Sequence, residues 1–326
     1  MTAESSESTG AASWVRVVGT FVALGLLGYL VWRQGWGEIW ESIRAISWGR
    51  FLLVAVLASL SRVMVASRWA SLLRLSGINL PLRRIFGIAY AGLFSSNFLP
   101  TSIGGDIIRL AGALEIEEQR AEYASSIAVD RIIGLVGMAV MLPIGIPIAL
   151  RRLDLTWEQL RPMLPLAIPL ASVQDPPLLG RYWDRFRNGI RRFWQVLLAW
   201  RNQPAALGAA FGFTWTHMLI KFSAMWILYS GLGERIGYWQ IAGLWAFVYM
   251  ISLFPVTINS FGLQEVSASI VYSELGGVTV AHALTVALVI RTVEMIASLP
   301  GVFTLPSMLE LRRRKAAPVP VRDDTA

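Results

Sequence analysis

The sequence contains no cysteine, which excludes disulfide bonds and thiol chemistry. Charged side chains are scarce, at 15% of the 326 residues, whereas soluble domains average about 25%. The sequence has no nucleotide-binding glycine loop, so nothing indicates ATP hydrolysis. It also has no serine nucleophile elbow. The two histidines, His217 and His282, stand on different apolar stretches without acids or thiols at metal-ligand spacing, and we expect neither a metal nor a cofactor.

Apolar residues are abundant, at 55% of the chain, and they gather in long stretches. Five stretches approach the ~20 residues that cross a bilayer: residues 14–32, 51–73, 127–150, 205–231 and 279–303. A weaker stretch at 158–174 carries Arg161 and three prolines. The first stretch follows an acidic tail and lacks a cleavage site, which indicates a retained span rather than a signal peptide. The sequence therefore predicts an integral membrane protein.

Two further apolar regions are interrupted, residues 85–114 at Pro100 and residues 239–275 at Pro255. Each half of the chain then has the order span, span, broken hairpin, span. If each hairpin returns to its own side of the membrane, each half crosses three times. An odd number of crossings inverts the second half relative to the first. The predicted fold is all-α and polytopic, with two inverted repeats of three spans plus a broken re-entrant helical hairpin. We expect a cytoplasmic tail at 1–13, a transmembrane domain at 14–311 with halves of about 14–150 and 158–303, and a basic tail at 312–326.

The net charge of +8 comes from basic residues that cluster between the apolar stretches. This pattern favours anionic phospholipid headgroups at the cytoplasmic face over nucleic acid. With both termini in the cytoplasm of a cell inner membrane, the cytoplasmic side receives Arg68, Arg74, Arg83, Arg84, Arg181 to Arg201 and Arg312 to Lys315. Residues 181–200 mix arginine with aromatic side chains, which predicts an interfacial helix; a solvated linker is the alternative.

Several charged residues occur inside the apolar regions. Backbone groups freed by a break must line protein or a wet cavity, and the helix after Gly104 and Gly105 would direct its free N–H groups there. Asp106 and Arg109 follow three residues apart on one helix face. An arginine at the bilayer centre costs roughly 2.5 to 3.5 kcal/mol, so it needs a partner or a purpose.

Other charged candidates repeat this pattern along the chain. They are Arg62, the adjacent Asp130 and Arg131, His217 with Lys221, Glu265 near the second break, and Arg291 with Glu294. One interpretation is that these charges only pair with one another and hold the helices together. The other is that they bind a substrate, because small residues would hold helices together at lower cost.

Three motifs, "NFLPTSIGGDIIR", "VDRIIGL" and "FPVTINSFGLQE", precede a last span with "RTVEMIASLPG". In this order they resemble the lysylphosphatidylglycerol synthase transmembrane-region family of flippase-like membrane proteins, over residues of about 15 to 310. The resemblance places family motif positions on Asn97, Pro100, Gly104, Gly105, Asp106, Arg109, Asp130, Arg131, Gly262 and Glu265. The second motif has fewer glycines here than the family often has, and the soluble aminoacyl-transferase domain of bifunctional relatives is absent, so we do not expect synthesis of a lysyl-lipid.

The predicted function is movement of an amphiphilic lipid, with an anionic or glycosylated headgroup, between leaflets. Arg109, Arg131 and Arg291 would neutralise the headgroup, and the acidic residues would pair with them in the empty site. The predicted substrate-binding residues are Asn97, Gly104, Gly105, Asp106, Arg109, Asp130, Arg131, Lys221, Gly262, Glu265, Arg291 and Glu294, with no catalytic residue and no metal ligand. The alternatives are an intramembrane transferase acting on a lipid or polyprenyl phosphate, with Asp106 or Glu265 as general base, and a non-transporting accessory subunit.

Overall fold

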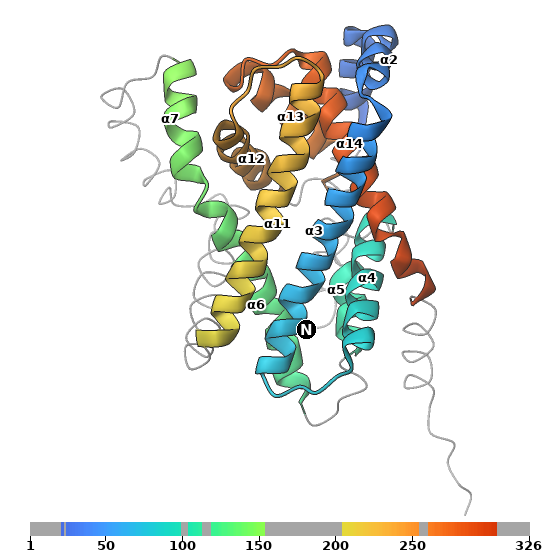
Figure 1. The fold of residues 1–326 in the computed structure, drawn as a ribbon, viewed down its shortest axis with the longest axis vertical. Helices are drawn as coiled ribbons and strands as arrows, with labels where there is room; N and C mark the ends of the chain where they lie inside the picture. Colours follow the sequence, from blue (N-terminus) through green and yellow to red (C-terminus); the bar gives the residue numbers. More distant parts are fainter. Residues whose placement is uncertain are drawn as a thin grey trace, which may run out of the picture.

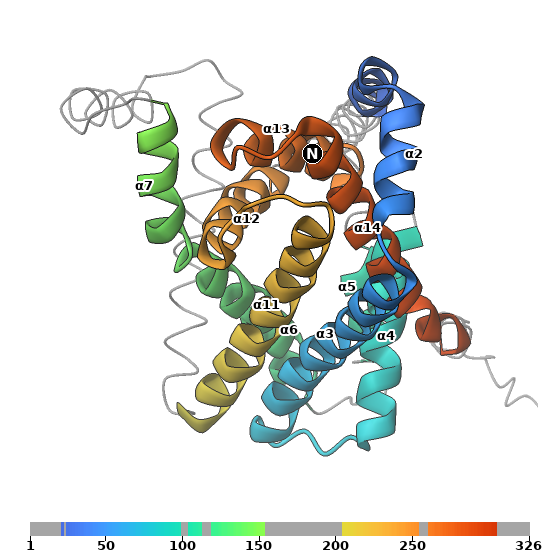
Figure 2. The same ribbon diagram turned by 45° about the horizontal axis from the view of Figure 1, so that its top comes forward.

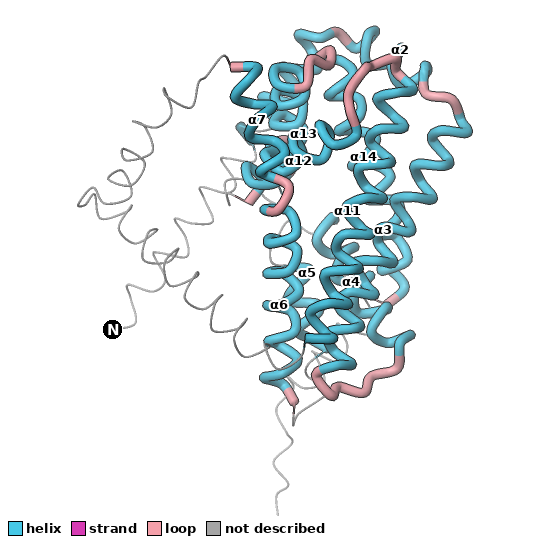
Figure 3. Tube along the Cα trace, turned by 60° about the vertical axis from the view of Figure 1, so that its left-hand side comes forward, coloured by secondary structure: helices cyan, strands magenta, loops and turns pink. Residues whose placement is uncertain are grey.

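The computed structural model describes residues 21–22, 24–98, 104–112, 119–153, 204–253 and 260–304. Every regular element in these residues is a helix, and no strand occurs among them (Figure 3). Three of the described helical stretches are long and apolar enough to cross a membrane: Trp48–Arg74, Glu122–Arg152 and Val280–Phe303. The prediction of an all-α membrane protein is confirmed.

Two long helices form the centre of the molecule. Helix α3 (Trp48–Leu75) and helix α11 (Pro204–Gly231) lie side by side and run in opposite directions (Figures 1 and 2). Their apolar residues are distributed around the whole helix rather than on one stripe, which is typical of helices surrounded by protein and lipid. Val54 of α3 and Phe222, Met225 and Leu228 of α11 belong to the largest buried cluster. This antiparallel pair is the frame on which the remaining helices pack.

Each central helix is followed by two shorter helices and then another long one. After α3 come α4 (Leu82–Phe98), α5 (Gly104–Ala111) and α6 (Arg120–Ala139); after α11 come α12 (Tyr238–Ser252), α13 (Leu263–Ile270) and α14 (Val280–Ser298). Helix α11 begins 156 residues after α3, and α12 begins 156 residues after α4. The helix order thus repeats. From α3 and from α11 onward the described helices follow the predicted order of elements, while the first span of the second half lies outside the described residues and the inverted repeat stays a prediction.

Both proline breaks fall between the paired short helices. Helix α4 ends at Phe98 and α12 at Ser252, shortly before Pro100 and Pro255, which lie outside the described residues. Gly262 is the N-cap of α13 and has a φ of 75°, a left-handed conformation that glycine adopts without a steric cost. The second short helix therefore begins at a glycine, as the first does.

Some local features differ from the predictions or add to them. The stretch 127–150 is not one continuous helix: α6 ends at Ala139 and α7 (Leu142–Arg152) starts after a turn, with Pro143 in its first turn. Proline has no N–H to donate to the preceding turn, so the helix is interrupted there. The last span likewise tightens into the 3₁₀-helix η4 (Leu299–Phe303) around Pro300. Helix α2 (Trp36–Ala45) and the π-helix η3 (Val271–Leu275) were not predicted.

Some predictions fall outside the described residues. They concern residues 14–20 of the first span, the stretch 158–174, the basic segment 181–200 and both terminal tails. These stay predictions from the sequence.

Candidate functional site

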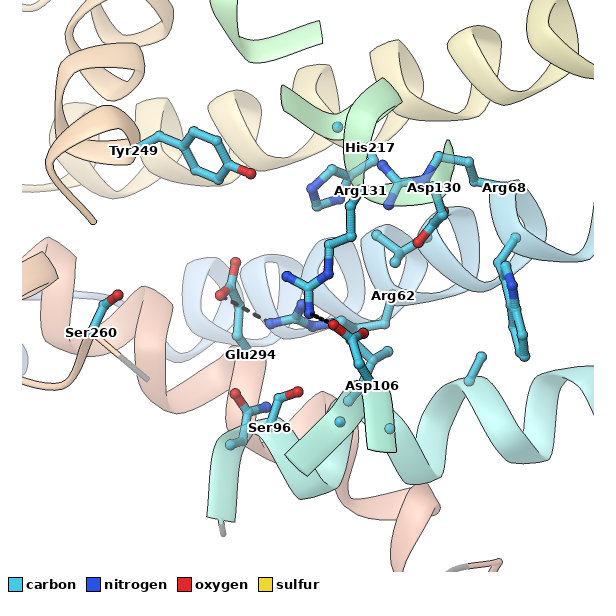
Figure 4. Close-up of a pocket in the computed structure, with 18 of the residues that line it drawn as sticks. Arg62, Arg68, Ser96, Asp106, Asp130, Arg131, His217, Tyr249, Ser260 and Glu294 are labelled. Carbon is cyan, nitrogen blue, oxygen red and sulfur yellow. Dashed lines mark hydrogen bonds and ion pairs between the residues drawn. The ribbon is translucent and has the colours of Figure 1, made fainter. Parts of the chain in front are cut away.

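A polar cavity of about 390 Å³ lies among the helices on both sides of the central pair. Five arginines and three carboxylates from the described residues line it: Arg62, Arg68, Arg109, Arg131, Arg291, Asp106, Asp130 and Glu294. Figure 4 shows side chains of α3, α5, α6, α11 and α14 converging on this space. Arginines and carboxylates are rare inside membrane proteins and mark sites where polar substrates or ions bind.

Asp130 of α6 is at the centre of one group of charges. Its side chain is only 3% exposed, and its two carboxylate oxygens accept hydrogen bonds from Arg68 Nε at 2.6 Å and from Arg109 Nη1 at 3.0 Å. Two guanidinium groups therefore compensate one buried carboxylate, which satisfies the charge of Asp130 and leaves the arginines in excess.

Asp106 and Arg131 extend this group toward the opening of the cavity. Arg131 Nη2 lies 2.8 Å from Asp106 Oδ2 (Figure 4), and the Arg131 side chain is 58% exposed. Arg109 Nη1 also lies 3.9 Å from Asp106 Oδ1. We call these five residues, Arg68, Asp106, Arg109, Asp130 and Arg131, the Asp130 cluster.

A second group surrounds Glu294 of α14. Its carboxylate lies 3.0 Å from Arg62 Nη2 of α3 and 2.8 Å from Lys221 Nζ of α11. Arg291 Nε lies 3.6 Å from Glu265 Oε1, and Arg291 Nη1 donates a hydrogen bond to Gln264 at 3.2 Å. We call Arg62, Lys221, Glu265, Arg291 and Glu294 the Glu294 cluster.

The two clusters share one structural relation. Asp106 is the third residue of α5 and Glu265 the third of α13, whereas Arg131 is the twelfth residue of α6 and Arg291 the twelfth of α14. In each half, an acid in the first turn of the short helix pairs with an arginine of the following helix. The repeat in the chain thus extends from the order of the helices to these ion pairs.

Glycines let the first short helix approach its neighbour. A Cβ on Gly105 would overlap the Ser96 hydroxyl and lie 2.6 Å from the carbonyl oxygen of Gly92. A Cβ on Gly92 would lie 2.9 Å from Cγ of Arg109. Close contact of α4 and α5 therefore requires both glycines, and it fixes where Arg109 enters the cavity.

The guanidinium of Arg109 also contacts a tryptophan, Trp69. The Arg109 guanidinium stands 4.3 Å from the ring centroid of Trp69, a distance typical of a cation–π contact. Trp69 in turn donates a hydrogen bond from Nε1 to Ser126 at 3.2 Å. Nε and Nη2 of Arg109 are buried and have no hydrogen-bond partner among the described residues. These donors are available to an anion.

The cavity also contains a histidine and several hydroxyl groups. His217 Nδ1 shares a hydrogen bond of 2.6 Å with Ser61 of α3. Ser96, Tyr249 and Ser260 line the cavity as well. The described residues include no group of three or more acids, histidines or cysteines that could hold a metal ion.

The structure brings most of the predicted site residues into one space. Eight of them line the cavity: Asn97, Gly105, Asp106, Arg109, Asp130, Arg131, Arg291 and Glu294. Lys221 and Glu265 are not among its lining residues but contact arginines or carboxylates that are. Gly104 and Gly262 instead mark the beginnings of α5 and α13. Asn97 donates from Nδ2 to the Ser298 hydroxyl at 3.0 Å, so it also joins α4 to α14.

Arg68 requires a correction. The orientation argument assigned it to a cytoplasmic loop, but it lies within α3, bonds to Asp130 and lines the cavity. The signal that identified Arg62, an arginine inside an apolar stretch, applied equally to Arg68.

Most of the ion pairs of the site join different helices. Asp106 and Arg109 are only 3.9 Å apart, and each has a shorter ion pair with a residue of α6. Glu294 likewise pairs with Arg62 and Lys221 of other helices. The ion pairs therefore connect different helices.

Two comparisons with known proteins complete the description. The family described as "Lysylphosphatidylglycerol synthase TM region" matches residues 16–301. A search of curated proteins found no significant match. Since the match spans most of the chain, the protein belongs to this family, and the predicted membership is confirmed.

Proposed function

We propose that this member of the lysylphosphatidylglycerol synthase transmembrane-region family moves a lipid with an anionic or glycosylated headgroup between the two leaflets of a cell inner membrane. Family membership supports a membrane protein that acts on lipids. The observation that carries the proposal of movement is the cavity, because it combines polar side chains from both halves of the chain inside an apolar helical domain. A headgroup that crosses a bilayer needs such a polar path, while its acyl chains remain in the lipid.

The mechanism we propose is an exchange of partners. In the empty site Arg131 pairs with Asp106 at 2.8 Å, and Arg109 pairs with Asp130 at 3.0 Å. A phosphate oxygen of the headgroup replaces a carboxylate as partner of an arginine, and the carboxylate takes the arginine back on release. Guanidinium groups bind carboxylates and phosphates with the same planar donor geometry, so a phosphate oxygen can take the place of a carboxylate oxygen.

The equivalent ion pairs of the two halves would provide two positions at which a headgroup can exchange partners. Asp106 with Arg131 belongs to the first half, and Glu265 with Arg291 belongs to the second. If the halves are inverted in the membrane, as we propose, these pairs face opposite leaflets and the headgroup passes from one cluster to the other. Both termini then lie in the cytoplasm.

The proposal is tested with the full chain in sealed vesicles containing a fluorescent anionic lipid. Wild-type protein is expected to expose inner-leaflet lipid to a membrane-impermeant quencher, and Arg109→Gln is expected to slow this movement by at least about tenfold, equivalent to ~1.4 kcal/mol of barrier. Arg44→Gln, on the exposed face of α2 beside Trp40, is the matched control and should retain the wild-type rate. Movement by Arg109→Gln at the wild-type rate would contradict the proposal, and chemical conversion of the lipid would favour a transferase.

A further inference from the structure

The charges of the two clusters do not balance. The Asp130 cluster has three cations and two carboxylates, and the Glu294 cluster has the same composition. Counting only the described residues that line the cavity gives five arginines against three carboxylates. By either count, the described part of the site has two more positive charges than negative ones.

This count covers the described residues alone, since the segment between α5 and α6, residues 113–118, reads ALEIEE and lies outside them. Residues 99–103 read LPTSI and residues 254–259 read FPVTIN, and neither contains an ionisable side chain. Uncompensated charges in a membrane interior are costly, since the surroundings solvate them poorly. The surplus among the described side chains therefore favours a ligand that carries the opposite charge.

The donors around the surplus charge are suited to phosphate. Nε and Nη2 of Arg109 and Nε of Arg62 are buried without a hydrogen-bond partner among the described residues. Arg109 belongs to the Asp130 cluster and Arg62 to the Glu294 cluster, so each cluster offers donors that its own carboxylates do not use. An arginine that has vacant N–H groups can bind a phosphate oxygen first and then exchange its carboxylate partner.

We propose that the site selects a lipid headgroup with two negative charges, a terminal phosphomonoester or a diphosphate. This inference rests on the proposed function and specifies its substrate class. A phosphomonoester carries about −1.5 to −2 charges at pH 7 and offers three acceptor oxygens. A phosphodiester lipid neutralises only half of the surplus, and an aminoacylated lipid with a cationic headgroup adds to it.

Lipids that differ only in headgroup charge provide the test. The full chain, purified in neutral detergent and delipidated, is titrated with phosphatidic acid, with phosphatidylglycerol of the same acyl chains and with inorganic phosphate, and the thermal unfolding midpoint is recorded. Ligands that bind only the folded protein raise this midpoint. We expect phosphatidic acid to bind at least about tenfold more tightly than phosphatidylglycerol, because one additional charge near the arginines contributes more than ~1.4 kcal/mol at low dielectric.

The variant for this test is Arg131→Gln, which removes one positive charge at the most exposed cation of the Asp130 cluster and so puts least strain on the fold. Its preference for phosphatidic acid should fall about tenfold, whereas Arg44→Gln should keep the wild-type preference. Lowering the pH to about 5 protonates the phosphomonoester, whose second pKa is near 6, and should also reduce the preference in the wild type.

The outcomes separate this inference from the proposed function. Equal binding of phosphatidic acid and phosphatidylglycerol by the wild type, or an unchanged preference in Arg131→Gln, would overturn the inference. Binding of inorganic phosphate as tight as that of phosphatidic acid would identify a site for free anions and overturn it too. A preserved preference in a protein that moves no lipid in vesicles would support the inference and refute transport.

Discussion

At the scale of single residues, the partners of the charged side chains were the least predictable feature. The sequence predicted that the acidic residues would pair with arginines of the site, and helix spacing identified only neighbours on one face, such as Asp106 and Arg109. In the structure Asp130 accepts hydrogen bonds from Arg68 of α3 and from Arg109 of α5. A buried carboxylate requires short hydrogen bonds to compensate its desolvation, and groups from other helices can reach it with better geometry. Sequence spacing carries no information on those helix positions.

Asp130 should be the carboxylate on which folding depends most. Asp130→Asn leaves the buried Arg68 without a negative partner among the described residues and leaves the buried Arg109 only Asp106 at 3.9 Å, so we expect it to lower the free energy of unfolding by about 3 to 5 kcal/mol. Asp106→Asn is the matched variant: its partner Arg131 is exposed, so the cost should be near 1 kcal/mol or less, as for surface pairs. Denaturant unfolding in detergent compares the two. Equal losses would contradict this difference in burial.

Glu234, in the loop between α11 and α12, makes a contact that depends on pH. It accepts hydrogen bonds from the backbone and hydroxyl of Thr279, the N-cap of α14, and from His282 Nδ1. Burial raises the pKa of this carboxyl, but these bonds lower it further, so the net pKa lies below its ordinary value of 4.5. A carboxyl with a depressed pKa in the folded state stabilises the protein above its unfolded pKa and loses this effect as the pH falls.

The resulting prediction concerns Glu234→Gln. Near pH 7 the variant should be less stable than the wild type by about 1 to 2 kcal/mol, the usual contribution of charge-assisted hydrogen bonds. As the pH decreases below 4.5, the wild type should lose this advantage. Unfolding midpoints of both proteins between pH 7 and pH 3 measure the difference. A difference that does not change with pH would show that the charge of Glu234 does not contribute.

At the scale of helices, the sequence predicted the elements well wherever a local signal marks them. Prolines and glycines correctly placed the ends of α4 and α12 and the starts of α5 and α13. The interruption between α6 and α7 was missed, although Pro143 offered the same signal, because the stretch remains apolar on both sides. Helix α2 was missed because it is short and amphipathic, and a search for long apolar stretches does not detect it.

A substitution at Gly105 tests the close packing of α4 against α5. In Gly105→Ala the new methyl group would overlap the Ser96 hydroxyl and approach the Gly92 carbonyl, so α5 must move away from α4. We expect a loss of about 1 to 3 kcal/mol, as for other overpacked contacts, together with reduced lipid movement because Arg109 shifts. Gly208→Ala, in α11 with open space around it, is the control and should be neutral or slightly stabilising. Equal stability of the two variants would exclude close packing at Gly105.

At the scale of the whole molecule, both copies of the repeated helix order contribute side chains to one cavity. The repeated order of helices and the equivalent pairs Asp106–Arg131 and Glu265–Arg291 agree with a duplicated chain whose halves face one site. The sequence predicted the repeat from the spacing of its breaks and predicted eight of the lining residues. The cavity itself, and the place of Tyr249 in it, depend on how distant helices pack, which no local pattern encodes.

The inverted arrangement can be tested by labelling, because the chain has no cysteine of its own. We expect a single cysteine introduced at Ser102 to react with a membrane-impermeant reagent from the cytoplasmic side, and one at Ser260 to react from the opposite side. Ser260 lines the cavity, whereas Ser102 lies outside the described residues and is chosen from the sequence. Labelling of Ser102→Cys only from the periplasmic side, or of Ser260→Cys only from the cytoplasmic side, would refute inverted halves.

The central claim is that the ion pairs exchange partners with a headgroup rather than merely holding helices together. The most direct test is lipid movement by the double variant Asp106→Asn with Arg131→Gln, in which two neutral amides replace a pair 2.8 Å apart. Removing both partners creates no additional uncompensated charge, so the variant should be as stable as the wild type, and the surplus of positive charge in the site is unchanged. The account predicts that it moves lipid in vesicles at least about tenfold more slowly than the wild type. A stable double variant that moves lipid at the wild-type rate would contradict the account.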